Sequence, residues 1–279
     1  MTKKVLIVSD LDGTLLNFKT FDFSPILPFI LELNNRGVQL VLNSSKCESE
    51  ILEIIQKFGF KLPYITENGS AIYIPKSILP KQPKESFDLG ENWVIKVGVT
   101  REIINKTIRH NNFKKFMKYI LFLKNMTHLQ KSYYTGLKIE SLERSQEKEF
   151  SEAMIWMGSN IELENFKKSL NEEGLSIVHG ARLLYLTGLN TKGDGMGILI
   201  EEYRRQNFND IEVISCGDSS NDLSMLENSD YSVVIRLPDK KNMKLKKNNN
   251  VFNSTKIAPL GWQEEVEKIP VIREMLDIK

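Results

Sequence analysis

Cysteine and histidine are scarce in this sequence of 279 residues. Its two cysteines, Cys47 and Cys216, lie far apart in the chain. This separation indicates no disulfide framework and fits a reducing compartment. The three histidines, His110, His128 and His179, include no pair with the spacing of metal ligands. The cysteines therefore do not predict a disulfide-stabilised protein, and the histidines do not predict a metal site.

An excess of charge of either sign is also missing. Lysine and arginine number 38 against 36 acidic residues, which gives a formal net charge of +2. So small a charge predicts neither nucleic acid nor an anionic membrane as the main partner, and any anion recognition has to be local. No apolar stretch approaches the roughly 18 residues that a membrane span needs. Because the amino terminus leads directly into a strand pattern, we expect a soluble, cytoplasmic protein.

The residues that are present point first to one stretch, Val5 to Leu16. Four apolar residues, Val5 to Val8, precede two carboxylates, Asp10 and Asp12, and a Gly-Thr pair. A continuous apolar run is typical of a strand covered on both faces, and open parallel sheets bind ligands beyond the carboxyl ends of their strands. Two carboxylates facing one cavity are costly without a cation, which predicts a divalent metal, Mg²⁺. The alternative is that Asp-Leu-Asp-Gly forms only a polar turn.

Predicted strands and helices alternate in the first and the last part of the sequence. A helix is expected from Ser24-Pro25 towards Gly37, followed by a second apolar strand at 38–42, and further strands are expected at 211–215 and 231–235. A hairpin is expected around the turn at 67–70. This order predicts an α/β fold, a Rossmann-like doubly wound parallel sheet.

The middle of the chain has a different pattern. From residue 75 to about 91, prolines and lysines interrupt any periodic pattern of apolar residues, which indicates a linker. Beyond it we expect a strand over 93–99, a helix over 113–126 and a strand over 153–157, as in a small α+β module. The predicted organisation is therefore core at 1–81, inserted module at 82–188 and core again at 189–279. The lysine-rich segment 239–250 is interpreted as a solvated loop, against an anion-binding patch.

Polar residues stand at four separate strand or helix ends that could share one site. In chain order these are Asp10 and Asp12, then Ser44, then Lys192, then Asp218 and Asp222. Singly, each has an ordinary interpretation, such as a helix cap for Ser44 or a solvated lysine. Together they predict one shared site.

This set resembles the haloacid dehalogenase superfamily of phosphatases. Its four motifs occur in order as Asp10 to Thr14, Ser44, Lys192 and Gly217 to Asp222, and the resemblance spans the whole chain. The insert looks like the type IIB (Cof-like) cap, and Asn68-Gly69 resembles a turn found in that branch. The resemblance implies a superfamily core with an inserted cap.

A narrower resemblance is to the mannosyl-3-phosphoglycerate and glucosyl-3-phosphoglycerate phosphatases. It lies in the segments 44–47, 149–152, 180–182 and 258–262. Lys148, Ala153, Ala181 and Cys47 depart from that family's pattern, and these departures bear on the sugar more than on the reaction.

The expected roles follow from these matches. Asp10 is expected to be the nucleophile, Asp12 the general acid and base, and Lys192 the catalytic cation. The Mg²⁺ ligands are expected among Asp10, Asp12, Asp218 and Asp222, with Asp12 contributing its backbone carbonyl. Contacts to the phosphate or the rest of the substrate are expected from Ser44, Ser45, Lys46, Asn68, Glu152, Arg182 and Asn221.

The expected activity is Mg²⁺-dependent hydrolysis of a glycosyl-3-phosphoglycerate through an aspartyl-phosphate, by a monomer or homodimer. Two alternatives stay open. One is a broader, sucrose-phosphate-like sugar-phosphate phosphatase or phosphomutase on the same scaffold, and the other is a non-catalytic protein that binds a phosphorylated metabolite.

Overall fold

The computed structural model describes residues 3–136, 147–179, 183–238 and 242–277, and the chain divides into two compact units. The first unit comprises residues 1–44, 54–96 and 191–279, and the second comprises 45–53 and 97–190. The first unit thus continues to Lys96, past the boundary expected at residue 81. The reason is that two strands from the expected linker and beyond it join the sheet of the first unit.

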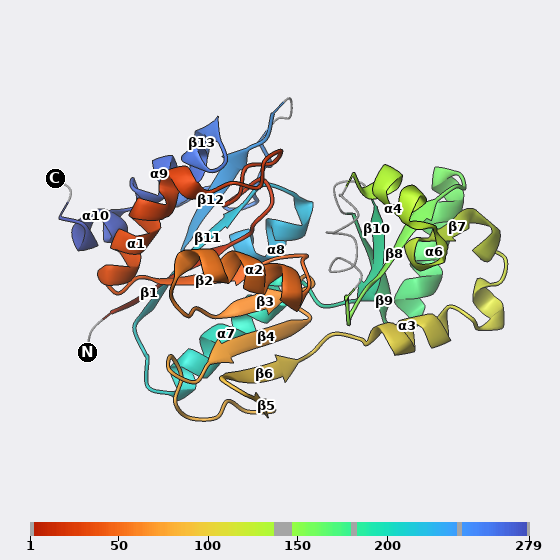
Figure 1. The fold of residues 1–279 in the computed structure, drawn as a ribbon, viewed down its shortest axis with the longest axis horizontal. Helices are drawn as coiled ribbons and strands as arrows, with labels where there is room; N and C mark the ends of the chain where they lie inside the picture. Colours follow the sequence, from red (N-terminus) through yellow and green to blue (C-terminus); the bar gives the residue numbers. More distant parts are fainter. Residues whose placement is uncertain (1–2, 137–146, 180–182, 239–241, 278–279) are drawn as a thin grey trace. The chain divides into compact units, whose positions relative to one another are not determined.

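The first unit is built on one sheet, in which the described residues form nine strands (Figure 1). Their order is β13-β12-β11-β1-β2-β3-β4-β6-β5. The bounds are β1 Lys4–Ser9, β2 Gln39–Asn43, β3 Tyr64–Thr66, β4 Ala71–Pro75, β5 Phe87–Leu89, β6 Asn92–Lys96, β11 Ile211–Gly217, β12 Tyr231–Arg236 and β13 Val251–Ile257.

The strands from β13 to β3 are parallel, whereas β4, β6 and β5 are antiparallel. Strand β1 lies between β11 and β2. The chain leaves β1 for β2 on one side and returns later to β11 on the other. The carboxyl end of β1 is therefore a topological switch point, where doubly wound sheets bind their ligands.

Helices cover both faces of this sheet. On one face, α7 (Lys192–Arg205) and α8 (Leu223–Glu227) pack apolar side chains against the strands, among them Tyr203 against a core that includes Val8. The next residue, Ser9, points to the opposite face because side chains alternate along a strand. There the Trp262 indole of α9 (Leu260–Val266) donates a hydrogen bond to Ser9 Oγ over 3.1 Å and lies edge-on to Phe29 of α1 (Leu27–Asn35). The predicted doubly wound arrangement is confirmed.

Two more helices and a 3₁₀ turn follow strands of this sheet. Helix α2 spans Glu48–Phe58 and α10 spans Pro270–Met275, and a 3₁₀ turn at Ser220–Asp222, η5, precedes α8. None of the helices in the described ranges is both long enough and apolar enough to cross a membrane.

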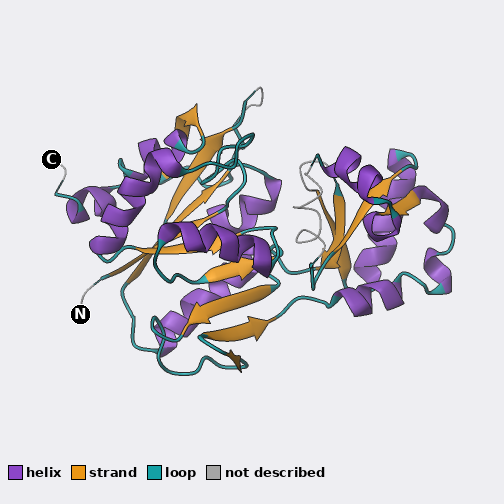
Figure 2. Cartoon of the chain, in the orientation of Figure 1, coloured by secondary structure: helices purple, strands orange, loops and turns teal. Residues whose placement is uncertain are grey.

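The second unit contains an antiparallel sheet of its own, in the order β7-β8-β10-β9 (Figure 2). The bounds are β7 Ile120–Phe122, β8 Glu152–Trp156, β9 Leu175–His179, β10 Leu184–Gly188, α3 Arg101–Thr107, α4 His128–Thr135 and α6 Asn160–Glu172. Phe166 of α6 and Ile104 of α3 are fully buried in its core beside Met154 of β8.

Some local expectations were right and others wrong. The hairpin around residues 67–70 is confirmed, because β3 and β4 pair in antiparallel register with Ile65 opposite Ile72. The helix expected over 113–126 is wrong: that stretch forms short 3₁₀ turns and strand β7. Its apolar residues Phe113 and Phe116 stand three apart, a spacing that also fits a 3₁₀ turn. Strand β13 was not expected at all.

Candidate active site

Three acidic side chains and one lysine meet at the carboxyl end of β1. Asp10 follows β1 directly and Asp218 follows β11, while Asp222 ends the short turn η5. Lys192 is the first residue of α7, whose start is capped by Thr191 together with Asp194. Because neighbouring parallel strands end at the same edge of the sheet, residues some 200 positions apart can lie in contact here.

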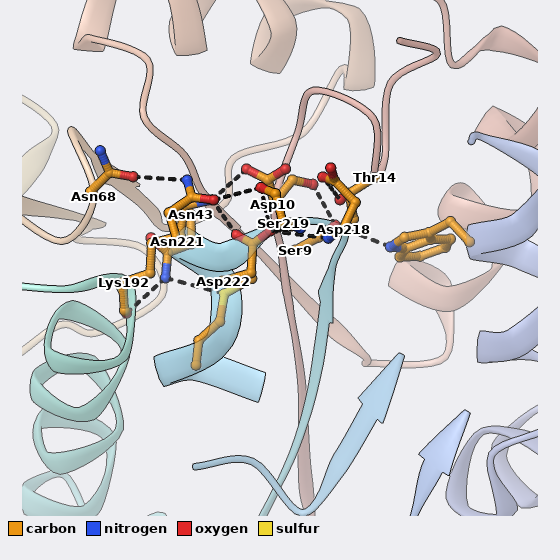
Figure 3. A network of polar contacts seen from close by, with 12 residues as sticks. Ser9, Asp10, Thr14, Asn43, Asn68, Lys192, Asp218, Ser219, Asn221 and Asp222 are labelled. Carbon is orange, nitrogen blue, oxygen red and sulfur yellow. Dashed lines mark hydrogen bonds and ion pairs between the residues drawn. The ribbon is translucent and has the colours of Figure 1, made fainter. Parts of the chain in front are cut away.

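Lys192 joins two carboxylates in the interior (Figure 3). Its Nζ lies 2.5 Å from Asp10 Oδ1 and 2.6 Å from Asp222 Oδ1, and its side chain is 0% exposed. Although burial alone lowers the pKa of a lysine, the charges of Asp10 and Asp222 outweigh it and raise the pKa of Lys192. Lys192 is therefore a fixed cation beside Asp10.

Two of the three carboxylates, those of Asp10 and Asp218, have pKa values above their ordinary range. Burial raises the pKa of Asp10 to about 6, with the nearby charge of Asp222 adding to the effect and Lys192 opposing it. Burial, then the charges of Asp10 and Asp222, raise the pKa of Asp218 to about 9. Crowding of this kind favours binding of a cation, because a cation relieves the repulsion between the carboxylates.

The donor set fits a hard divalent metal ion. Asp10, Asp218 and Asp222 each offer a carboxylate oxygen, and these oxygens lie within 4.8 Å of one another. Oxygen ligands of this type suit Mg²⁺. Thr14 Oγ1 donates a hydrogen bond to Asp218 Oδ1 over 2.8 Å and so orients that carboxylate.

Both carboxylate oxygens of Asp222 accept hydrogen bonds. Its Oδ2 accepts the backbone N–H groups of Asp218 and Ser219, each over 3.0 Å, while Oδ1 faces Lys192. Ser219 Oγ in turn donates to Asn221 Oδ1 over 2.6 Å. Asp222 therefore orients the loop that carries Asp218, and it holds the Lys192 ammonium group.

The expected phosphate-binding residues Ser44 and Asn68 lie in the same unit as the aspartates. Ser44 follows β2 and is 1% exposed, and its carbonyl accepts the Asn68 N–H over 3.0 Å. Asn68 Oδ1 accepts a hydrogen bond from Asn221 Nδ2 over 3.2 Å (Figure 3). The turn between β3 and β4 is therefore connected to β2 and to the Asp218–Asp222 loop.

Asp12 is half-buried two residues beyond Asp10, and its backbone pairs with Leu16 across the turn. Its carboxylate is not part of the acidic group formed by Asp10, Asp218 and Asp222. This position is compatible with the expected acid–base role and with a contribution from its carbonyl, and both stay predictions.

The other expected substrate contacts lie elsewhere in the chain. Ser45 and Lys46 belong to the second unit, where the Ser45 carbonyl accepts a hydrogen bond from Lys148 Nζ over 2.6 Å. Glu152 is 2% exposed and its carboxylate is engaged with Arg101 and Lys124. Arg182 lies outside the described residues.

Sequence reasoning missed three residues of this network. Thr14, Ser219 and Asn43 each hold another group of the site by a hydrogen bond. Thr14 and Ser219 lie within the recognised motifs. For Asn43 the only signal was a polar residue at the end of an apolar strand, and we return to it below.

Similarity to known proteins is clear along most of the chain. Residues 7–250 match the haloacid dehalogenase-like hydrolase family. A glucosyl-3-phosphoglycerate/mannosyl-3-phosphoglycerate phosphatase of Methanococcoides burtonii is 28% identical over 94% of this chain and 96% of its own length. A mannosyl-3-phosphoglycerate phosphatase of Pyrococcus furiosus is 31% identical over 82% of this chain and 90% of its own.

Solved structures share the fold. A crystal structure from Thermoplasma acidophilum aligns over the whole of both chains with a TM-score of 0.62 and 16% identity. A phosphatase of the haloalkanoate dehalogenase superfamily from Bacteroides thetaiotaomicron aligns over 84% of each chain with a TM-score of 0.58 and 18% identity. The family match, the identity to the relatives and the fold together place this chain in the haloacid dehalogenase-like hydrolase family.

Proposed function

We propose that this protein is a Mg²⁺-dependent phosphatase that hydrolyses a mannosyl- or glucosyl-3-phosphoglycerate to phosphate and the glycosylglycerate. That it is a phosphoric monoester hydrolase follows from its family and from the activity for which both relatives are named. The substrate and the metal are the proposed part. The contact of Lys192 with Asp10, beside Asp218, is the observation that carries the proposal.

Asp10 is proposed as the nucleophile. An Asp10 carboxylate oxygen attacks phosphorus, a new O–P bond forms, and the ester bond to the glycerate oxygen breaks. The pKa of Asp10 is about 6, so this carboxylate is ionised at neutral pH. Lys192 offsets the negative charge on Asp10 and on the phosphoryl oxygens as they approach, which is an electrostatic contribution to catalysis.

Asp12 is proposed to move the protons. It donates a proton to the departing glycerate oxygen and then accepts one from the water that attacks the aspartyl-phosphate, which releases phosphate and regenerates Asp10. Mg²⁺, when held by Asp10, Asp218 and the Asp12 carbonyl, neutralises charge on the phosphoryl oxygens. Ser44, at the end of β2, is proposed to bind a phosphoryl oxygen.

Phosphate release from a panel of esters tests the proposal. The panel contains mannosyl- and glucosyl-3-phosphoglycerate, sucrose 6-phosphate and simple hexose phosphates, each with and without Mg²⁺. We expect hydrolysis of a glycosyl-3-phosphoglycerate in preference to the others, only with Mg²⁺. Equal rates on every ester would favour a broad sugar-phosphate phosphatase, and transfer of phosphate between positions of one sugar would favour a phosphomutase.

Two variants make this test specific. Asp10→Asn keeps the size of the side chain and removes the nucleophile, so we expect no turnover. Asp88→Asn changes an exposed carboxylate of the same unit, paired with Lys76, and we expect wild-type rates. Turnover by Asp10→Asn at the wild-type rate, or no activity of the wild type on any ester, contradicts the proposal.

A further inference from the structure

Asn43, at the last position of β2, contacts the backbone of Lys192. Its side chain is 0% exposed. Its Nδ2 donates a hydrogen bond to the backbone carbonyl of Lys192 over 2.9 Å, and the sulfur of Met225 lies 3.7 Å away (Figure 3). A side chain of the central sheet thus holds the first residue of α7.

The side-chain amide of Asn43 contains an oxygen atom whose burial costs free energy. Within the described residues, Asn43 Oδ1 is buried and has no hydrogen-bond partner. A buried acceptor without a partner lowers stability, and an apolar side chain of the same shape avoids that cost. Since Leu has the same branched heavy-atom skeleton as Asn, β2 could end in an apolar residue here without losing its strand pairing. The amide therefore points to a function that requires the Nδ2 donor.

The start of α7 is also packed closely from two other directions. A Cβ on Gly69, in the β3–β4 turn, would lie 2.0 Å from the carbonyl oxygen of Thr191, so only glycine fits there. On the other side, the Gly193 N–H donates to Ser224 Oγ over 2.9 Å. These contacts fix the backbone on either side of Lys192, and Asn43 fixes Lys192 itself.

The Lys192 backbone and its ammonium group are coupled through a single fully buried side chain. Because Nζ reaches both Asp10 and Asp222 at short distance, a shift of the helix start moves the cation relative to both carboxylates. A displacement of about 1 Å at a reacting group can cost on the order of a hundredfold in rate. The position of the α7 start is therefore a determinant of the charge beside the nucleophile.

We propose that Asn43 is a positioning residue for phosphoryl transfer: its side-chain amide fixes the Lys192 carbonyl and thereby places Lys192 Nζ between Asp10 and Asp222. This inference rests on the proposed function for its effect on turnover. Its structural part, the placement of Lys192, is open to a test that needs no substrate.

The test compares Asn43→Leu with the wild type by kinetics and by chemical labelling. Leu has the same branched skeleton and removes both the donor and the unpartnered acceptor. We expect kcat to fall on the order of tenfold to a hundredfold while KM stays within about twofold. Lys192 is fully buried, so we expect slow acetylation by acetic anhydride in the wild type and faster acetylation in the variant, read by mass spectrometry of the Lys192 peptide.

A matched control comes from the opposite end of the same helix. The Gln206 amide donates to the Lys81 carbonyl over 2.6 Å and accepts the Lys81 N–H over 3.3 Å, so Gln206→Leu removes amide–backbone hydrogen bonds at the far end of α7. We expect this control to keep the wild-type kcat and the slow labelling of Lys192. The urea midpoint of Asn43→Leu should stay close to that of the wild type, because the lost hydrogen bond is offset by removal of the unpartnered oxygen.

The outcomes separate cleanly. Asn43→Leu with wild-type kcat and slow Lys192 labelling overturns the proposal, and so does an equal loss in Asn43→Leu and Gln206→Leu. If Asn43→Leu does not fold, Asn43→Ala removes the same donor without adding branched carbons, and the same readouts decide. If the wild type hydrolyses no ester, the proposed function fails, whereas Lys192 labelling still decides the positioning role.

Discussion

Replacing Glu152 by glutamine distinguishes a structural role of this residue from the substrate contact that the sequence predicts. Glu152 begins β8 in the second unit and is 2% exposed. Its carboxylate accepts hydrogen bonds from Arg101 at 3.1 and 3.3 Å, from Lys124 at 2.8 Å and from Asn105 at 3.0 Å. Glutamine keeps one acceptor oxygen but turns an NH₂ group towards these donors, and it removes the negative charge that faces Arg101 and Lys124.

The size of the effect follows from burial. Removing one partner of a fully buried ion pair costs about 3–5 kcal/mol. The side chains of Arg101 and Lys124 are 28% and 32% exposed, so water can replace part of the lost interaction. We therefore expect Glu152→Gln to lower the free energy of unfolding of the second unit by about 1–3 kcal/mol.

The effect should depend on pH. Burial alone raises the pKa of Glu152, but the hydrogen bonds from Arg101, Lys124 and Asn105 outweigh it and hold that pKa below its usual range. A lowered carboxyl pKa contributes stability that is fully present above the unfolded value of about 4.3 and is lost as pH falls through the folded value. The stability difference between wild type and Glu152→Gln should therefore be largest near neutral pH and shrink in acid.

Hydrogen exchange resolved by peptide is the appropriate assay, because it reports the two units separately. We expect faster exchange in β8 and β10 of Glu152→Gln and unchanged exchange in β1. Glu164→Gln, which removes a surface pair with Lys167 in the same unit, should have little effect. Unchanged exchange in β8 together with a raised KM would refute this reasoning and support the predicted substrate contact.

Three further predictions concern the first unit. Gly69→Ala should lower both stability and kcat, because its Cβ would stand 2.0 Å from the Thr191 carbonyl at a residue with φ of +93°. Urea unfolding and steady-state kinetics measure these effects, and an unchanged variant would contradict the close packing. Lys192→Met should lower kcat at least about a hundredfold in a phosphate-release assay, since the cation between Asp10 and Asp222 is lost. Dialysis against EDTA should abolish phosphate release, and added Mg²⁺ should restore it. Mg²⁺ should also raise the melting temperature, because it relieves the repulsion between the carboxylates. Activity that survives chelation would exclude this metal role.

The sequence alone predicted the chemistry of the site and determined the class of fold. The apolar run before Asp10 identifies a buried strand, and a strand covered on both faces requires helices on both sides of the sheet. The motifs around Asp10, Lys192 and Asp218 indicated phosphoryl transfer, because in type and order they resemble those of a phosphatase superfamily. These features depend on residue type and short-range spacing, which a single sequence carries in full.

Only the tertiary structure decided which groups touch. The contact of Asn43 with Lys192 joins residues from β2 and α7, and no local pattern encodes a contact between elements so distant in the chain. The same holds for β5, whose short run looks like a linker until β6 provides an edge to pair with, and for the pairing of β6 with β4. Pairing and close packing depend on the partner surface, and that surface exists only once the sheet has formed.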